Sequence, residues 1–188
     1  MRSKLLIAAL VLTPSLAFAH GGAPGHTHSF MDGVLHPLNG LDHLLAAFAI
    51  GLWAVVSGMR RPWLVPLTFV AAMTAATLAG ASGIVLPRAE WMIAASVMAL
   101  GLLCLFAPRL PVAAGMAIAA LFALAHGYAH GSEGDASTPY LAGLIASTAA
   151  LHVAGMASGY LALFAERPAL ARLAGAVIAV GGVFVLVA

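Results

Sequence analysis

The segment that decides how this chain folds is His126-Gly127-Tyr128-Ala129-His130-Gly131-Ser132-Glu133, which ends a long run of Ala, Leu and Met. On an α-helix, side chains four positions apart lie on one face, so His126 and His130 project together and Glu133 follows on the same side. This is the spacing of metal ligands on a helix. The glycines that flank the histidines are typical of transmembrane helices that approach closely. The stretch therefore indicates a metal site in a membrane helix.

The composition supports a membrane setting for the whole chain. Of the 188 residues, 63% are hydrophobic and 7% are charged, and the mean hydropathy is +1.05. A soluble domain usually carries about 25% charged residues. The apolar runs are about 17 to 25 residues long, enough for a helix to cross about 30 Å of hydrocarbon. We therefore predict an all-α, polytopic membrane protein. A net charge of +2 without a basic tract gives no support for nucleic-acid binding.

Six transmembrane spans are predicted in a domain of residues 36–188. They cover about Leu38 to Ser57, Leu64 to Ser82, Trp91 to Ala107, Val112 to Ala129, Tyr140 to Phe164 and Leu173 to Val187. The loops after the first, third and fifth spans carry Arg60, Arg61, Arg109, Arg167 and Arg172. The opposite side carries Asp32, Glu90, Glu133, Asp135 and one arginine, Arg88. Because cytoplasmic loops are enriched in Lys and Arg, we expect both termini outside the cytoplasm.

Residues 1–19 are typical of a secretory signal peptide. Two basic residues precede an apolar run that is short for a spanning helix, and the small residues ending at Ala19 fit a cleavage site. We expect the mature chain to begin at His20; an uncleaved extra helix is the alternative. The free α-amine and imidazole of His20 could bind a metal, with two more histidines in the periplasmic segment 20–35. Otherwise this segment is a flexible leader with incidental histidines.

A second histidine motif, His36-Pro37-Leu38-Asn39-Gly40-Leu41-Asp42-His43, opens the first span. Proline suits the first turn of a helix and disfavours helical geometry in the residue before it, so we expect His36 just outside the helix. Seven residues of ideal helix would separate His36 from His43 by about 10 Å, too far for one ion. The two can share a metal only if the first turn is distorted at Gly40. Asp42 could orient a histidine ligand. A purely structural pair with His43 is the alternative.

These two motifs place all their candidate ligands on the outer side of the membrane. The candidates are His36, Asp42, His43, His126, His130 and Glu133. His152 lies about twelve residues, or roughly 18 Å, inside the outer end of the fifth span. A buried imidazole needs a partner or a purpose, and a hydrogen bond with Thr148 is the structural alternative. An outer cluster with a deeper site at His152 would form a path for an ion.

The other polar residues of the spans are interpreted as scaffold. Thr68, Thr74, Thr77 and Ser96 are expected to bond back to their own helices. The single cysteine, Cys104, lies in an apolar run and is expected to be a small buried filler. Glycines at 155 and 159 indicate that the fifth span packs inside the bundle, and those at 175, 181 and 182 would allow tight contacts, including with a second copy in a homo-oligomer. The sequence contains no nucleotide-binding motif, so we do not expect the protein to use ATP directly.

The run His36-x5-Asp42-His43 and the run His126-Gly127-x-Ala129-His130-Gly131-x-Glu133 together resemble the HupE/UreJ family of bacterial nickel permeases. The resemblance extends to the number of spans, the signal peptide and the order of the motifs. It implies an inner-membrane protein that transports nickel, or in some relatives cobalt, often for hydrogenase or urease assembly. It also implies that the six outer candidates are the metal-binding residues. Ala125 stands where an aromatic residue is expected, which affects the packing of the pocket and not its ligands.

The leading prediction is a permease whose substrate is Ni²⁺, with Co²⁺ or Zn²⁺ as alternatives. Imidazole and carboxylate groups suit these ions, and the lack of a cysteine cluster argues against a Cu(I) site. A membrane-embedded zinc enzyme, with His126 and His130 as ligands and Glu133 or Asp42 as base, is a second hypothesis. A periplasmic metal receptor or a maturation partner for hydrogenase or urease is a third. Net flux of metal distinguishes the permease from both.

Overall fold

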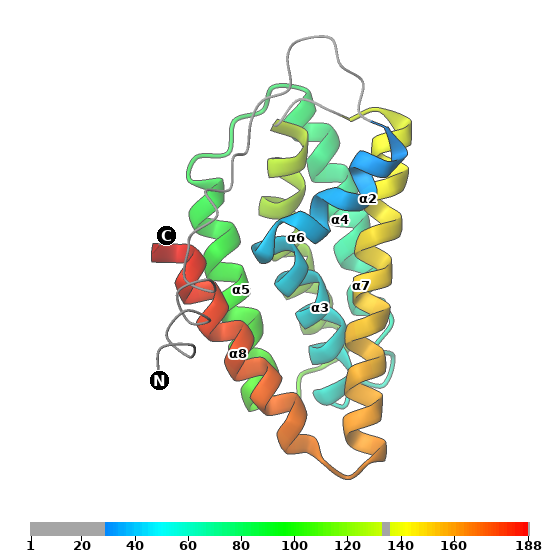
Figure 1. The fold of residues 1–188 in the computed structure, drawn as a ribbon, viewed down its shortest axis with the longest axis vertical. Coiled ribbons are helices and arrows are strands. Elements are labelled where there is room, and N and C mark those ends of the chain that lie inside the picture. Colours follow the sequence, from blue (N-terminus) through cyan, green and yellow to red (C-terminus); the bar gives the residue numbers. More distant parts are fainter. Residues whose placement is uncertain (1–28, 133–135, 188) are drawn as a thin grey trace, which may run out of the picture.

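The computed structural model describes residues 29–132 and 136–187. These residues form seven α-helices and no strand (Figure 1). The helices are α2 (Phe30–Asn39), α3 (Leu41–Val56), α4 (Leu64–Ala81), α5 (Ala89–Phe106), α6 (Val112–Ser132), α7 (Thr138–Phe164) and α8 (Pro168–Val187). The predicted signal peptide, His20 and Glu133 lie outside the described residues.

The helices α4 to α8 are each long and apolar enough to cross a membrane. Helices α2 and α3 meet this criterion only as a pair, and they are bent by 86° relative to each other. Counting the bent pair as one span gives six. The prediction of an all-α polytopic membrane protein is confirmed. The helix of the predicted first span covers Leu41–Val56, and Gly40 separates it from α2, at the position where a distorted first turn was expected.

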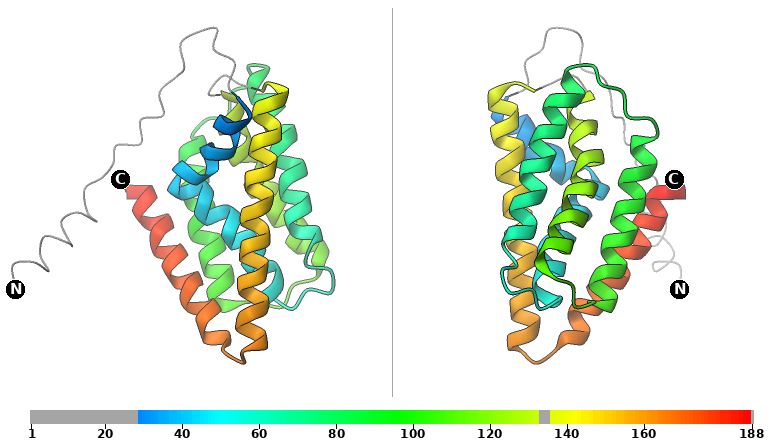
Figure 2. Two further views of the ribbon diagram at one scale, coloured as in Figure 1. Left: turned by 45° about the vertical axis from the view of Figure 1, so that its right-hand side comes forward. Right: turned by 180° about the vertical axis from the view of Figure 1, so that it is seen from behind.

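Helix α3 is the centre of the bundle. It contacts each of the other six described helices, and α5 with α8 form one side while α4, α6 and α7 form the other (Figure 1, Figure 2). The side chains of Ile50, Leu52 and Trp53 in α3 are fully buried. A helix that is apolar on all sides is typical of a position enclosed by other helices.

Glycines let several pairs of helices approach until the backbone of one contacts the backbone of the other. An added Cβ at each would collide with the backbone of the partner helix: Gly51 with His152 and Gly155 with Phe48 (α3 and α7), Gly127 with Met73 and Gly131 with Thr77 (α4 and α6), Gly101 with Ala179 and Gly182 with Met98 (α5 and α8). These contacts confirm the predicted close packing at Gly127, Gly131 and Gly155. Gly175 and Gly182, considered above for a second copy, pack against α5 of the same chain.

The arginine-rich loops lie at one end of the bundle. The chain reverses there after α3, α5 and α7, and at the opposite end after α4 and α6 (Figure 1). Arg60, Arg61, Arg109 and Arg167 therefore share one end, and the bent α2 lies toward the other. This arrangement matches the alternation of loops that the sequence predicts.

We predict that Gly155→Val destabilises the protein. The new side chain would press on the Phe48 carbonyl and force α3 and α7 apart, at a cost of about 1–3 kcal/mol. Ala157→Val, at an exposed position of the same helix, is the matched control. Thermal unfolding in detergent, followed by size-exclusion fluorescence, measures the effect. Equal melting temperatures for the two variants would contradict the proposed packing.

Candidate metal site

His36 and His43 meet because the chain bends sharply between them. Gly40 is extended, with φ −93° and ψ 115°, and it separates the end of α2 from the start of α3. The imidazole centroids of His36 and His43 lie 5.8 Å apart as a result, whereas a straight helix would separate the two residues by about 10 Å along its axis. The distortion that a shared metal requires is therefore present.

His36 itself lies inside a helix, which corrects the expectation that it precedes one. Ser29 and Asp32 form a capping box: the Ser29 amide donates to Asp32 Oδ2 at 2.7 Å, and the Asp32 amide donates to Ser29 Oγ at 3.2 Å. This cap starts α2 at Phe30, and the helix continues through Pro37. The prediction failed because Pro37 was taken to mark a helix start, while the cap at Ser29, eight residues upstream of this proline, sets it.

Three imidazoles from three helices form a potential metal-binding group. His36 of α2, His43 of α3 and His130 of α6 each offer a nitrogen, and the three nitrogens lie within 4.8 Å of one another. The ring of His130 lies 4.7 Å from that of His36 and 4.6 Å from that of His43, centroid to centroid. Imidazole nitrogens bind an ion at about 2.0–2.1 Å. A small contraction of this group, called the outer triad below, would therefore enclose one ion.

Asp42 fixes the tautomer and the orientation of the His43 ring. The Nδ1 atom of His43 lies 2.7 Å from Asp42 Oδ1, and a carboxylate can only accept, so Nδ1 carries the proton and donates it. The neutral ring then presents a lone pair at Nε2, which is buried and has no hydrogen-bond partner among the described residues. The structure thus places Asp42 behind His43, in the orienting role considered above, and outside the outer triad.

His130 is almost entirely buried, with 1% of its surface exposed. Its Nδ1 atom has no hydrogen-bond partner in the described part of the chain. Leaving a buried polar atom unpaired costs about 1–3 kcal/mol. Such a cost is expected at a site that exists to receive a ligand.

His126 plays a different part from the one its spacing suggests. Its Nε2 atom lies 2.9 Å from Ser96 Oγ, and the Ser96 hydroxyl already donates to the Ile93 carbonyl at 2.7 Å. Nε2 must therefore be the donor to Ser96, so in this arrangement only Nδ1 of His126 has a lone pair that could bind a metal. His126 lies beside the outer triad, 5.0 Å from His43, and is not a member of it.

Ser96 is a site residue that the sequence analysis missed. Its bond to its own helix was predicted and is present. The second bond joins α5 to α6 across thirty positions of sequence, and no local pattern marks it. Tyr140, with its ring 6.0 Å from that of His36, was missed for the same reason.

His152 lies apart from the outer triad, in the middle of α7. It is 2% exposed, and neither ring nitrogen has a partner among the described residues. The structural alternative of a bond from Thr148 was wrong, because the Thr148 hydroxyl points to the sulfur of Met73 at 3.9 Å. Phe69 packs against the imidazole with ring centroids 5.2 Å apart.

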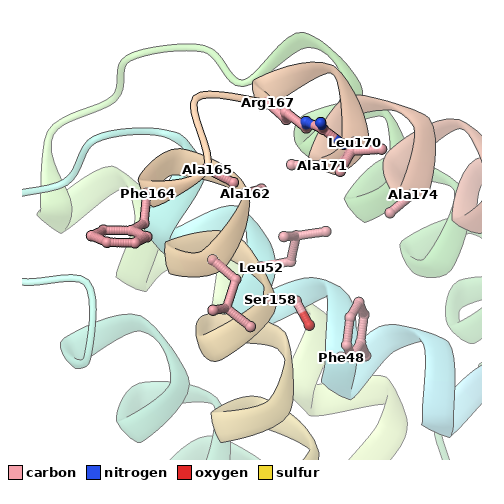
Figure 3. Close-up of a pocket in the computed structure, with 11 residues that line it drawn as sticks. Phe48, Leu52, Ser158, Ala162, Phe164, Ala165, Arg167, Leu170, Ala171 and Ala174 are labelled. Atoms are coloured by element: carbon pink, nitrogen blue, oxygen red, sulfur yellow. The ribbon is translucent and has the colours of Figure 1, made fainter.

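A cavity of about 520 Å³ lies elsewhere, between α3, α7 and α8 (Figure 3). It is lined mainly by apolar side chains such as Phe48, Leu52 and Leu170, and Arg167 lies at the arginine-rich end. None of its lining residues is a histidine or a carboxylate. This cavity lacks the chemistry to bind a metal and does not belong to the site.

We predict that Asp42→Asn weakens metal binding by about 10- to 100-fold, because the neutral amide no longer fixes the tautomer and basicity of His43. Glu90→Gln removes the same charge from an exposed position at the same end of the bundle and is the control. Calorimetric titration of the purified protein with Ni²⁺, Co²⁺ and Zn²⁺ measures the affinities. An unchanged affinity in Asp42→Asn would show that the carboxylate does not support the site.

Comparison with known proteins supports the resemblance seen in the two histidine motifs. The family described as HupE / UreJ protein matches residues 8–185. Protein HupE of Rhizobium leguminosarum bv. viciae is 39% identical over 184 residues, which cover 96% of this chain and 95% of the relative. No solved structure gives a significant match. Since the match spans nearly the whole chain in both comparisons, this protein belongs to the HupE/UreJ family of metal permeases.

Proposed function

We propose that this protein is a secondary permease that carries Ni²⁺ from the periplasm to the cytoplasm across the bacterial inner membrane. The observation that supports the proposal most strongly is the outer triad, in which a bend within a membrane span brings histidines of α2, α3 and α6 around one point. An interrupted helix at membrane depth is tolerated where it lines a cavity or binding site. Membership of the HupE/UreJ family supports the same function.

The orientation of the protein in the membrane is inferred from the distribution of charge. The arginine-rich end belongs in the cytoplasm by the positive-inside rule, which places the outer triad and both termini on the periplasmic side. An ion would bind first at the triad and then at His152, deeper in the bundle. Several moderate sites in series release an ion more readily than one closed four-ligand cage.

The choice of ion rests on ligand chemistry together with the family. Imidazole nitrogens suit Ni²⁺, Co²⁺ and Zn²⁺, and the outer triad contains no thiolate that would favour Cu(I). Nickel is proposed first because the motifs resemble those of nickel permeases. Assembly proteins of hydrogenase or urease are the proposed recipients of the delivered ion.

The zinc-enzyme hypothesis has less support from the geometry. It requires His126 and His130 to bind one ion together, yet His126 lies outside the group of three imidazoles whose nitrogens meet within 4.8 Å, and its Nε2 is engaged by Ser96. A receptor or maturation partner would use the same outer triad without moving the ion. It would have no need of a second imidazole as deep and as unpaired as His152.

We expect His43→Ala and His130→Ala each to reduce nickel uptake to the background of cells without the protein. The measurement is accumulation of radiolabelled nickel by metal-starved cells, at matched amounts of protein in the membrane. Unlabelled cobalt and zinc as competitors rank the three ions. His28→Ala, in the N-terminal segment, is the control and should weaken uptake only at low nickel concentration.

Two results would count against the permease. Uptake by His130→Ala equal to that of the wild type would remove the outer triad from the path. Nickel bound at the surface of wild-type cells without accumulation would favour the receptor.

A further inference from the structure

The aromatic rings of the site form a continuous row from the outer triad toward the middle of the membrane. After His36, His130 and His43, the next ring is His126, 5.0 Å from His43. Phe69 of α4 follows, 5.9 Å from His126, and its other contact in the row is His152 at 5.2 Å. Phe69 is the member of the row that has no polar atom.

The outer triad and His152 are too far apart to hold the same ion. The carbonyl of His152 packs against Gly51 of α3, so the two residues lie at the same depth. Gly51 is eight residues beyond His43 on one helix, which corresponds to about 12 Å along the axis. An ion must therefore leave the triad completely before it can reach His152.

Phe69 occupies the space that joins the two imidazoles. Its side chain is 2% exposed, and its ring meets His152 edge-on, at an interplanar angle of 86°. One turn along α4, the carbonyl of Met73 packs directly against Gly127 of α6, the neighbour of His126 in the sequence. The backbone of α4 is thus held close to α6 here, and the phenyl ring itself is the part that can turn aside.

We propose that Phe69 is the gate between the outer triad and His152. This inference rests on the proposed permease function and adds a residue that binds no metal. An apolar ring that fills a narrow passage excludes water and hydrated ions until it rotates. The ring opens the passage when an ion advances and closes it when the passage is empty, which prevents a leak of protons or other cations.

Access to a thiol at position 152 tests the gate directly. The protein carries Cys104→Ala and His152→Cys, so that the thiol at position 152 is its single thiol, and it is placed in right-side-out membrane vesicles. External Ag⁺ that reaches this thiol binds it and blocks later labelling by a maleimide. With Phe69 in place, we expect this protection from labelling to develop slowly. Adding Phe69→Ala should speed this protection by roughly tenfold or more, because the constriction is removed. His43→Cys in place of His152→Cys reports that Ag⁺ reaches the outer site in either background.

Matched variants guard against a general loss of structure. Phe48→Ala removes an equal ring from α3, at a position that lines the separate cavity, and should leave the protection rate unchanged. Phe69→Leu and Phe69→Val keep part of the volume, so the rate should rise in the order Phe, Leu, Val, Ala. If the rate of Ag⁺ protection is the same for every residue at position 69, Phe69 does not control the passage and the proposal is wrong.

A second readout separates this inference from the permease proposal. Phe69→Trp should lower nickel uptake at least about tenfold while nickel affinity at the outer triad stays unchanged, because the larger ring obstructs passage and not binding. Uptake equal to that of the wild type would overturn the gate. A failure of the permease proposal would instead appear as absent uptake in the wild type, with the Ag⁺ protection pattern intact.

Discussion

The bend at Gly40 is the constraint on which the candidate site depends. It turns α2 back over the bundle and brings His36 beside His43 and His130. A side chain at position 40 would meet Asp42 Oδ1 at 2.9 Å and His43 Nδ1 at 3.2 Å, so the bend and the Asp42–His43 hydrogen bond need the same small residue. Reciprocal packing of Gly33 on the Tyr140 carbonyl and Gly143 on the Phe30 carbonyl fastens α2 to α7. Two features of the backbone, the bend at Gly40 and the packing of α2 on α7, therefore hold His36 in place.

Glycines at a helix contact also position His152, the deeper histidine. Contacts of Gly51 and Gly155 set the register of α3 against α7 and thereby fix how far His152 lies below the outer triad. In hydrocarbon, helix association depends on close packing and hydrogen bonds and not on the hydrophobic effect. The unpaired nitrogens of His43, His130 and His152 are costly in such a setting. Binding of an ion by these nitrogens would offset the cost of burying them unpaired.

The polar groups around the site divide between those that bind and those that hold other groups in place. Asp42 fixes the tautomer of His43, and Ser96 fixes the orientation of His126. Asp42 precedes His43 on α3, whereas Ser96 lies on α5, which packs against the helix of His126. The imidazoles of His43 and His126 lie in contact, yet their hydrogen bonds differ. His43 donates from Nδ1 to Asp42, which leaves Nε2 for an ion, whereas His126 donates from Nε2 to Ser96. Proximity alone therefore does not identify the ligands of this site.

Sequence patterns were enough to predict the membrane setting, the five continuous spans, the end of the bundle at which the arginines gather and most of the histidines involved. These features follow from composition, run length and the i, i+4 spacing, all of which are local. Three features became visible only in the folded chain: α2 is a separate helix, His126 is engaged by Ser96, and Phe69 lies between His126 and His152. Each of these depends on contacts between helices distant in sequence, and the depth and rotation of packed helices are set by those contacts and not by local periodicity.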